Sequence, residues 1–326
     1  MKLANSLRRI AVAAAFSCLA AVAGAQSAFP HKPIHLLVAF PPGGSTTAVA
    51  QLLGEKLTQR LGQPVVIENR PGANGMIASQ DLLRAPRDGY TLLMIVNTHA
   101  INPVMKVTLP YDTLKDFAPV STLYKLELVL VAHPKVQADN LQEFIALAKS
   151  KPRGLNFAAG DNGGLTHLAA ETFNTEAGTK LQVIPYKGTG PALNDTLGGH
   201  VQAYFSSPTA VIQHVKAGSL KAYAISGKER ASALPDVPTF AESGMPAFQA
   251  GTWAGILAPG GTPQPVIDQL SKEIGAVMQL PDVQAQLNKF GLESFVTTPS
   301  EFSALIESDI QRFGDVVKAA NMKPAD

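Results

Sequence analysis

The sequence predicts an α/β protein whose strands form mostly parallel sheets, and three observations support this fold class. Short aliphatic runs of strand length alternate with longer segments in which apolar residues recur at helical spacing. Hydrophobic residues make up 46% of the chain and charged residues 16%, which supplies large buried cores and rules out a disordered chain or a coiled coil. The length of 326 residues leaves room for about two domains of ordinary size.

The first predicted elements form a βαβαβ unit. A buried strand is expected over 34–40, and a Pro-Pro-Gly-Gly turn then leads to Ser45, which can cap a helix with apolar residues at helical spacing. The unit is completed by a strand over 65–67, a helix over 74–83 and a strand over 91–96. This order is the repeat of a doubly wound sheet.

The rest of the chain continues the alternation and ends in helices. The predicted strands cover 126–132, 155–159, 183–186, 201–205 and 220–225. The predicted helices cover 141–149, the segment around 167–173, 191–197, 266–277, 283–290 and 302–320. Pro and Gly breaks separate the helices of the C-terminal part.

Residues 1–25 are interpreted as a signal peptide. Basic residues precede an apolar run over 10–23, and small residues then lead to Gln26, the expected start of a mature periplasmic protein. A membrane anchor is the alternative, but the run is short of the ~20 residues that a spanning helix needs. A lipoprotein site at Cys18, the single cysteine, is also possible, although the residues before it match that signal poorly.

Composition and motifs argue against several function classes. The formal net charge of +2 gives no basic surface for nucleic acid. With one cysteine, disulfides and thiolate metal sites are excluded. The chain shows no nucleophile elbow, zinc-protease helix, P-loop or dinucleotide fingerprint, so we expect no metal, no cofactor and no enzyme.

Two glycine loops are the most informative features. One spans 40–47 and the other 159–166, and each leaves a predicted strand and enters a predicted helix. A helix N-terminus has unpaired N–H groups and the positive end of the helix dipole, and therefore attracts an anion. Because one loop falls in each expected domain, we expect the two loops to hold a carboxylate across a cleft.

From about His31 to the C-terminus the chain resembles the tripartite tricarboxylate transporter receptors, the Bug-type periplasmic solute-binding proteins. The motifs that carry the resemblance are FPPGG (40–44), LGQPVVIENRPGANG (61–75), DGYTLL (88–93), LPYDTLKDFAPV (109–120), THLAAETF (166–173), PYKGTGPALNDTLGG (185–199), AGSLKAYAIS (217–226), LPDVPTFAESG (234–244) and WAGILAPGGTP (253–263). The resemblance implies a type II-like, two-lobed periplasmic-binding-protein fold that closes on a small carboxylate and delivers it to membrane transporter subunits. We expect a monomer.

The expected lobes combine 27–124 with 226–326, and 125–225, with hinge crossings near Tyr124 and Ile225. The resemblance implies first-lobe ligand contacts at Gly44, Ser45, Thr46, Thr47, Asn97 and Thr98. It implies second-lobe contacts at Ala159, Gly160, Gly163, Gly164 and Thr166, with Tyr186, Lys187, Gly188, Ser206 and Ser207 nearby.

Three side chains have two open interpretations. His167 can donate to a ligand or hydrogen-bond within its loop, Lys187 can supply ligand charge or lie in solvent, and Trp253 can stack on a ligand or fill the core.

The chain departs from the family pattern at several of these positions. Thr47 stands where Asp is usual, Gln51 where Arg is usual, Ala159 where Ser is common, and Gly164 where Ser or Thr is common. The loss of Asp at position 47 removes an obvious partner for an ammonium group. We therefore expect an aliphatic or aromatic mono- or dicarboxylate rather than a citrate-like or amino-acid ligand. A sensor subunit for a membrane signalling protein, and a secreted hydrolase or lyase using the same cleft, are the alternative functions.

Overall fold

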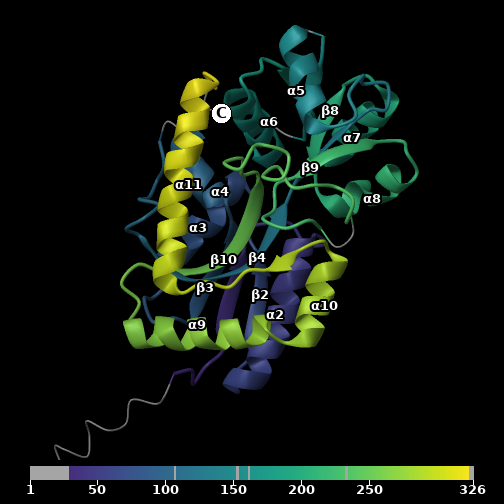
Figure 1. Ribbon diagram of the computed structural model, residues 1–326. Coiled ribbons are helices and arrows are strands. Elements are labelled where there is room, and N and C mark those ends of the chain that lie inside the picture. The colour runs from purple at the N-terminus through teal and green to yellow at the C-terminus, as the bar shows by residue number, and fades with distance from the viewer. Residues whose placement is uncertain (1–28, 106–107, 152–153, 161, 232–233, 323–326) are drawn as a thin grey trace, which may run out of the picture.

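The computed structural model describes residues 29–105, 108–151, 154–160, 162–231 and 234–322. The predicted signal peptide lies outside these residues. Two β-sheets organise the described part of the chain, each flanked by helices (Figure 1). The chain is therefore α/β and two-lobed, as the sequence predicts.

The first sheet has the strand order β11-β4-β10-β3-β1-β2. Its strands are β1 (Ile34–Val38), β2 (Val65–Asn69), β3 (Thr91–Val96), β4 (Phe117–Glu127), β10 (Gly251–Pro259) and β11 (Glu293–Ser294). The strands β2, β1 and β3 are parallel, as expected from the βαβαβ pattern. In contrast, β10 runs antiparallel to both β3 and β4, so the sheet is mixed.

The second sheet has the order β7-β6-β8-β5-β9. Its strands are β5 (Val129–Ala132), β6 (Asn156–Ala159), β7 (Gln182–Pro185), β8 (Ala203–Ser206) and β9 (Lys221–Ile225). Here β6 is parallel to β7 and β8, whereas β5 is antiparallel to β8 and β9. In both sheets, crossover helices connect the parallel strands. The antiparallel strands include β4, β5 and β10, which lie next to the points where the chain passes from one sheet to the other.

The helices cover the faces of the two sheets. They are α2 (Ser45–Leu61), the single turn η1 (Ala73–Gly75), α3 (Met76–Leu83), α4 (Thr98–Met105), α5 (Leu141–Ser150), α6 (Leu165–Ala177), α7 (Thr189–Gly198), α8 (Pro208–Lys216), α9 (Gln264–Met278), α10 (Pro281–Lys289) and α11 (Pro299–Ala319). In Figure 1, α9 and α10 accompany the first sheet, whereas α5, α7 and α8 surround the second. The long helix α11 contacts α4 and α6, so it bridges the two lobes.

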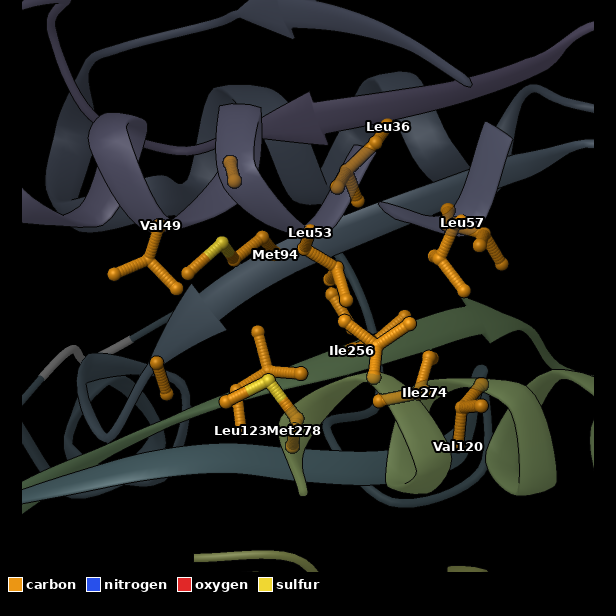
Figure 2. Close-up of a cluster of buried hydrophobic side chains, with 14 of the residues drawn as sticks. Leu36, Val49, Leu53, Leu57, Met94, Val120, Leu123, Ile256, Ile274 and Met278 are labelled. Atoms are coloured by element: carbon orange, nitrogen blue, oxygen red, sulfur yellow. The ribbon is translucent and has the colours of Figure 1, made fainter. Parts of the chain in front are cut away.

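The core of the first lobe lies between the sheet and the helices α2 and α9. On α2, Val49, Leu53 and Leu57 recur at four-residue spacing and are buried on one helix face. They meet strand residues such as Met94 and Ile256 (Figure 2). This packing fixes the direction of α2, and with it the position of the glycine loop at its N-terminus.

The core of the second lobe is aromatic and includes residues that the sequence assigns to the first lobe. The rings of Phe240 and Phe248 lie 4.0 Å apart between centroids, and Phe248 stacks on Phe205 of β8. The chain leaves the first sheet at Glu127, enters the second at Val129, and re-enters the first at Gly251. Because the segment between β9 and β10 packs on the second sheet, we propose lobes over 29–127 with 251–322, and over 128–250, instead of the divisions expected from sequence.

Candidate functional site

A cavity of about 300 Å³ is lined by loops of both lobes. Its lining residues are Phe40, Ser45, Thr46, Asn74, Val96, Asn97, Thr98, Ile101, Asn102, Tyr124, Leu126, Asn162, Gly163, Gly164, Leu165, Thr252 and Leu292. Residues of both glycine loops thus line the same cavity. Of the expected contacts, it brings together Ser45, Thr46, Asn97, Thr98, Gly163 and Gly164.

Three helices begin at this cavity. Ser45 and Thr46 open α2, Thr98 opens α4, and Leu165 opens α6. The N-caps of α2 and α6 are Gly44 and Gly164, which have no side chain to accept from the first N–H groups, and none of the three helices has an acidic residue in its first turn. The helix ends therefore present N–H donors and positive dipole ends to one shared space, which suits an anion.

The Asn97–Thr98 segment supplies an oriented amide and an unused hydroxyl. Thr252 Oγ1 donates to Asn97 Oδ1 at 2.8 Å, and Asn97 Nδ2 donates to the Gly251 carbonyl at 3.2 Å, so the amide is held by β10. Thr98 Oγ1 is enclosed and has no hydrogen-bond partner among the described residues. An enclosed hydroxyl gains most from a partner, and a rotation of the Thr98 side chain toward the cavity would let Oγ1 donate to a ligand oxygen.

Tyr124 places a second hydroxyl at the cavity. Its OH lies 3.2 Å from Thr46 Oγ1, and burial raises the pKa of Tyr124 to about 12. The phenol is therefore neutral at physiological pH and can act as a donor. The sequence placed Tyr124 at the hinge and gave it no ligand contact.

The remaining walls are apolar or neutral. Phe40, Val96, Ile101, Leu126, Leu165 and Leu292 supply the apolar surface. No charged side chain occurs among the residues that line this cavity in the described structure. An anion bound here is therefore held by dipoles and hydroxyls rather than by an ion pair.

The loop before α3 also reaches the cavity. Asn102 Nδ2 on α4 donates to the Asn74 carbonyl at 3.1 Å, and both residues line the wall. Asn74 adopts a left-handed backbone conformation with φ of 53°, which Asn tolerates better than most residues. The glycines of the NRPGANG segment give it the look of a functional loop, although its sequence favours a turn that supports the first lobe. The structure adds that Asn74 of this segment lines the cavity.

A second, shallower cavity adjoins the first on the second lobe. It shares Asn162 and Leu165 with the first cavity, and its other lining residues are Gly160, Thr166, Tyr186, Lys187, Gly188 and Thr189. Five of these were expected from sequence, including Lys187, the charged group of the set. Desolvation and the 2.7 Å hydrogen bond to Asp195 raise the pKa of Tyr186 to about 12, so this phenol is also neutral.

Thr47 lies beside the cavities without lining them. It is buried, donates to the Pro41 carbonyl at 3.2 Å and accepts from Asn69 Nδ2 at 2.9 Å. The side chain thus ties the first glycine loop to β2. Gly44, which precedes it as the N-cap of α2, shapes the same loop.

His167 likewise orders the second glycine loop. Its Nδ1 accepts from the Gly163 N–H at 3.1 Å, and burial lowers the pKa of the imidazole. The ring is therefore neutral and bonded within its loop, which favours the second of its two sequence interpretations. Ala159 is also structural, because it is buried at the end of β6 and its carbonyl accepts from Tyr186 N.

Ser206 and Ser207 line neither cavity. Ser206 is buried at the end of β8, and Ser207 is the N-cap of α8, with its Oγ 3.4 Å from Thr209 Oγ1. Trp253 fills the core, as one of its two interpretations has it: the indole N–H donates to Asp309 at 2.7 Å and the ring packs edge-on against Phe302. Within the described ranges, no group of three His, Cys, Asp or Glu side chains could hold a metal ion, and no helix is long and apolar enough to cross a bilayer.

Two α/β lobes that share a cavity suited to an anion define a solute-binding protein. The family model described as tripartite tricarboxylate transporter family receptor matches residues 49–322, and the chain belongs to this family. The protein is thus a periplasmic solute-binding receptor.

Individual relatives agree with this assignment. Protein BugT of Bordetella pertussis is 38% identical over 323 residues, which cover 98% of this chain and 99% of the relative. The solved structure of Rpa4515 of Rhodopseudomonas palustris with adipate is 30% identical, with a TM-score of 0.74, and covers 91% of this chain and 100% of that one. The structure of MatC of the same organism with bound malate is 32% identical, with a TM-score of 0.70, and covers 89% and 100%.

Proposed function

We propose that this receptor captures a small aliphatic or aromatic mono- or dicarboxylate between its lobes and delivers it to a membrane transporter. The observation that carries the proposal is the convergence of three helix N-termini on one cavity without a charged side chain among its described lining residues. This arrangement holds a carboxylate through neutral donors. Two relatives of similar fold bind adipate and malate, which are both dicarboxylates.

The cavity favours a ligand with an apolar body. Leu126, Leu165 and Leu292 face a space of about 300 Å³, which is at the small end of ligand pockets. A linear dicarboxylate can place one carboxylate at the helix ends and direct the other toward Lys187 in the adjoining cavity. Citrate would bury a third carboxylate against leucines, and an amino acid would bury an ammonium group without an acidic partner, so both should bind weakly.

Binding requires no chemistry at this site. The described lining of the main cavity offers no carboxylate, imidazole or lysine to transfer a proton. The ligand instead stabilises the arrangement in which it contacts both lobes. We propose that the chain acts as a monomer, after export and removal of the leader near Gln26.

A thermal-shift panel on the protein purified from the periplasm tests the proposal. Adipate, malate, benzoate, citrate and glutamate form the panel, after unfolding and refolding to remove any host ligand. A ligand at 100 times its Kd adds about 2.7 kcal/mol of stability, which raises the Tm by several degrees. A rise with adipate or benzoate but not with citrate or glutamate supports the proposal. A rise with citrate alone, or none across the panel, contradicts it.

A further inference from the structure

Three segments of the chain meet at one hydroxyl where the two sheets join. Glu127 ends β4, Ser226 directly follows β9, and Ala250 directly precedes β10; we call these three residues the lobe junction. Ser226 Oγ accepts from the Leu128 N–H at 2.9 Å and lies 2.8 Å from Glu127 Oε2. It also hydrogen-bonds to the Ala250 carbonyl. Both crossings between the lobes are thus tied to Ser226.

The segments at the lobe junction are packed too closely for additional side chains. A Cβ on Gly251 would lie 2.6 Å from the Leu126 carbonyl oxygen and 3.1 Å from Glu127 Oε2. A Cβ on Gly227 would lie 3.3 Å from Glu127 Cγ. Glycine at these two positions lets the Glu127 side chain reach Ser226 across the junction. The contact is therefore part of how the lobes are joined and not a surface accident.

The protonation state of Glu127 decides which hydrogen bonds can form at the lobe junction. A serine hydroxyl carries one proton, so it can donate to the Ala250 carbonyl or to an ionised Glu127, but not fully to both. When Glu127 is protonated, its O–H donates to Ser226 Oγ, and Ser226 donates to Ala250. Every contact is then satisfied. When Glu127 ionises, one of the two links loses its proton.

The charges around Glu127 leave it responsive to pH. Burial raises the pKa of Glu127. The hydrogen bond from Ser226 lowers this pKa, and so does Lys125, whose Nζ lies 3.7 Å from Glu127 Oε1. Glu293, which pairs with Lys125 at 3.2 Å, adds to the rise. A cavity of about 450 Å³ behind the junction is also lined by the charged side chains Lys228, Asp309 and Arg312. Asp309 and Arg312 neutralise each other at 2.7 Å.

We propose that Glu127 and Ser226 form a proton-dependent latch that sets how firmly the two lobes are held in their ligand-sharing arrangement. The proposal rests on the proposed function and adds a regulation of the same cleft. The protonated latch holds the junction as observed, and ionisation releases one link and lets the lobes separate. Ligand affinity should therefore fall about fivefold as the pH rises, the worth of one hydrogen bond between neutral groups.

The test measures the distance between the lobes without any ligand. Spin labels are attached at Gln59→Cys on α2 and Ala146→Cys on α5, both exposed. Cys18, the single natural cysteine, lies in the predicted leader and is absent from the mature chain. In the parent protein, we expect the separated population to rise about fivefold between about pH 5 and pH 8.5. Glu127→Gln supplies a permanent donor to Ser226 and should stay at the low-pH distance throughout. Ser226→Ala should remain separated at both pH values.

Glu293→Gln is the matched control, because it removes a nearby exposed acid that does not touch Ser226; the separation should still depend on pH, but with its midpoint at lower pH, because Glu293 contributes to the raised pKa of Glu127. The latch is overturned if the parent shows no pH-dependent change, or if Glu127→Gln follows the same pH profile as the parent. The measurement needs no ligand, so it separates the two proposals. A pH-dependent distance in a protein that binds no carboxylate would reject the proposed function and leave the latch standing.

Discussion

Replacement of Thr98 by Val tests the proposed contact between this residue and the ligand. The two side chains have nearly the same shape, and Thr98 Oγ1 has no hydrogen-bond partner among the described residues. The substitution therefore removes no hydrogen bond within that part of the protein. A hydrogen bond to a carboxylate contributes about 1.5–3 kcal/mol, and about 1.4 kcal/mol corresponds to a tenfold change in Kd. We expect Thr98→Val to weaken adipate binding by about 10- to 100-fold.

The assay is calorimetric titration with adipate, paired with urea unfolding of the ligand-free protein. Thr98→Val should keep or slightly raise the free energy of unfolding, because an enclosed hydroxyl without a partner is replaced by a methyl group. Thr98→Ser retains the hydroxyl and is the control, with a Kd within a few-fold of the parent. An unchanged Kd in Thr98→Val would refute the assignment of Thr98 to the ligand.

Three further predictions concern the helix ends, the core and the acid sensitivity of the protein. Leu165→Asp should weaken adipate binding at least about tenfold in titration while the Tm holds, because a carboxylate at the start of α6 suits the helix but repels the ligand; undiminished binding would contradict the anion site. Gly255→Ala should lower the free energy of urea unfolding by about 1–3 kcal/mol, because its Cβ would lie 2.3 Å from Phe302 Cζ; a smaller loss would show that the ring can move. Burial lowers the pKa of His99 to about 4, so the stability it confers is present above pH 6.5 and is lost as the pH falls toward 4. That loss is on the order of 3 kcal/mol. His99→Gln should therefore flatten the fall in the free energy of unfolding, measured by urea titrations at several pH values. An unchanged fall would show that another group causes it.

Local sequence signals predicted the elements whose residues form a clear strand or helix pattern. The aliphatic runs at β1, β3, β6 and β8, and the spaced apolar residues of α2, correspond to the observed elements. The expected strand over 126–132 is in fact divided, with β4 ending at Glu127 and β5 beginning at Val129 in the other sheet. Glu127 is the one polar residue in this run, and a single polar residue does not mark a change of sheet.

Other elements were missed because their residues are locally ambiguous. The helix α4 contains Pro103, and the strand β10 contains two glycines at 251 and 255, which weaken the helical and strand patterns respectively. Tertiary pairing forms β10 nevertheless, since it lies between β3 and β4. Packing against neighbours decides such segments, and local propensity does not.

The candidate site likewise contains residues that local sequence signals identify and residues that only the fold brings to the cavity. The glycine loops identified Ser45 and Gly164, because a loop that opens a helix has a sequence signature. Leu292 and Thr252 come from distant parts of the chain and reach the cavity only through the fold. Thr47 belongs to the first glycine loop, but its hydroxyl bonds to Pro41 and Asn69 and it lines neither cavity. Such contacts decide which way a side chain points within a loop.

The most direct test of the carboxylate site is a crystal structure of the protein with adipate. We expect one carboxylate of adipate within hydrogen-bond distance of the first N–H groups of α2 and of Thr98 Oγ1, with the methylene chain against Leu126 and Leu165. We also expect contacts from both glycine loops to the same ligand. Adipate bound outside this cavity, or held there by a charged side chain instead of the helix ends, would contradict the account.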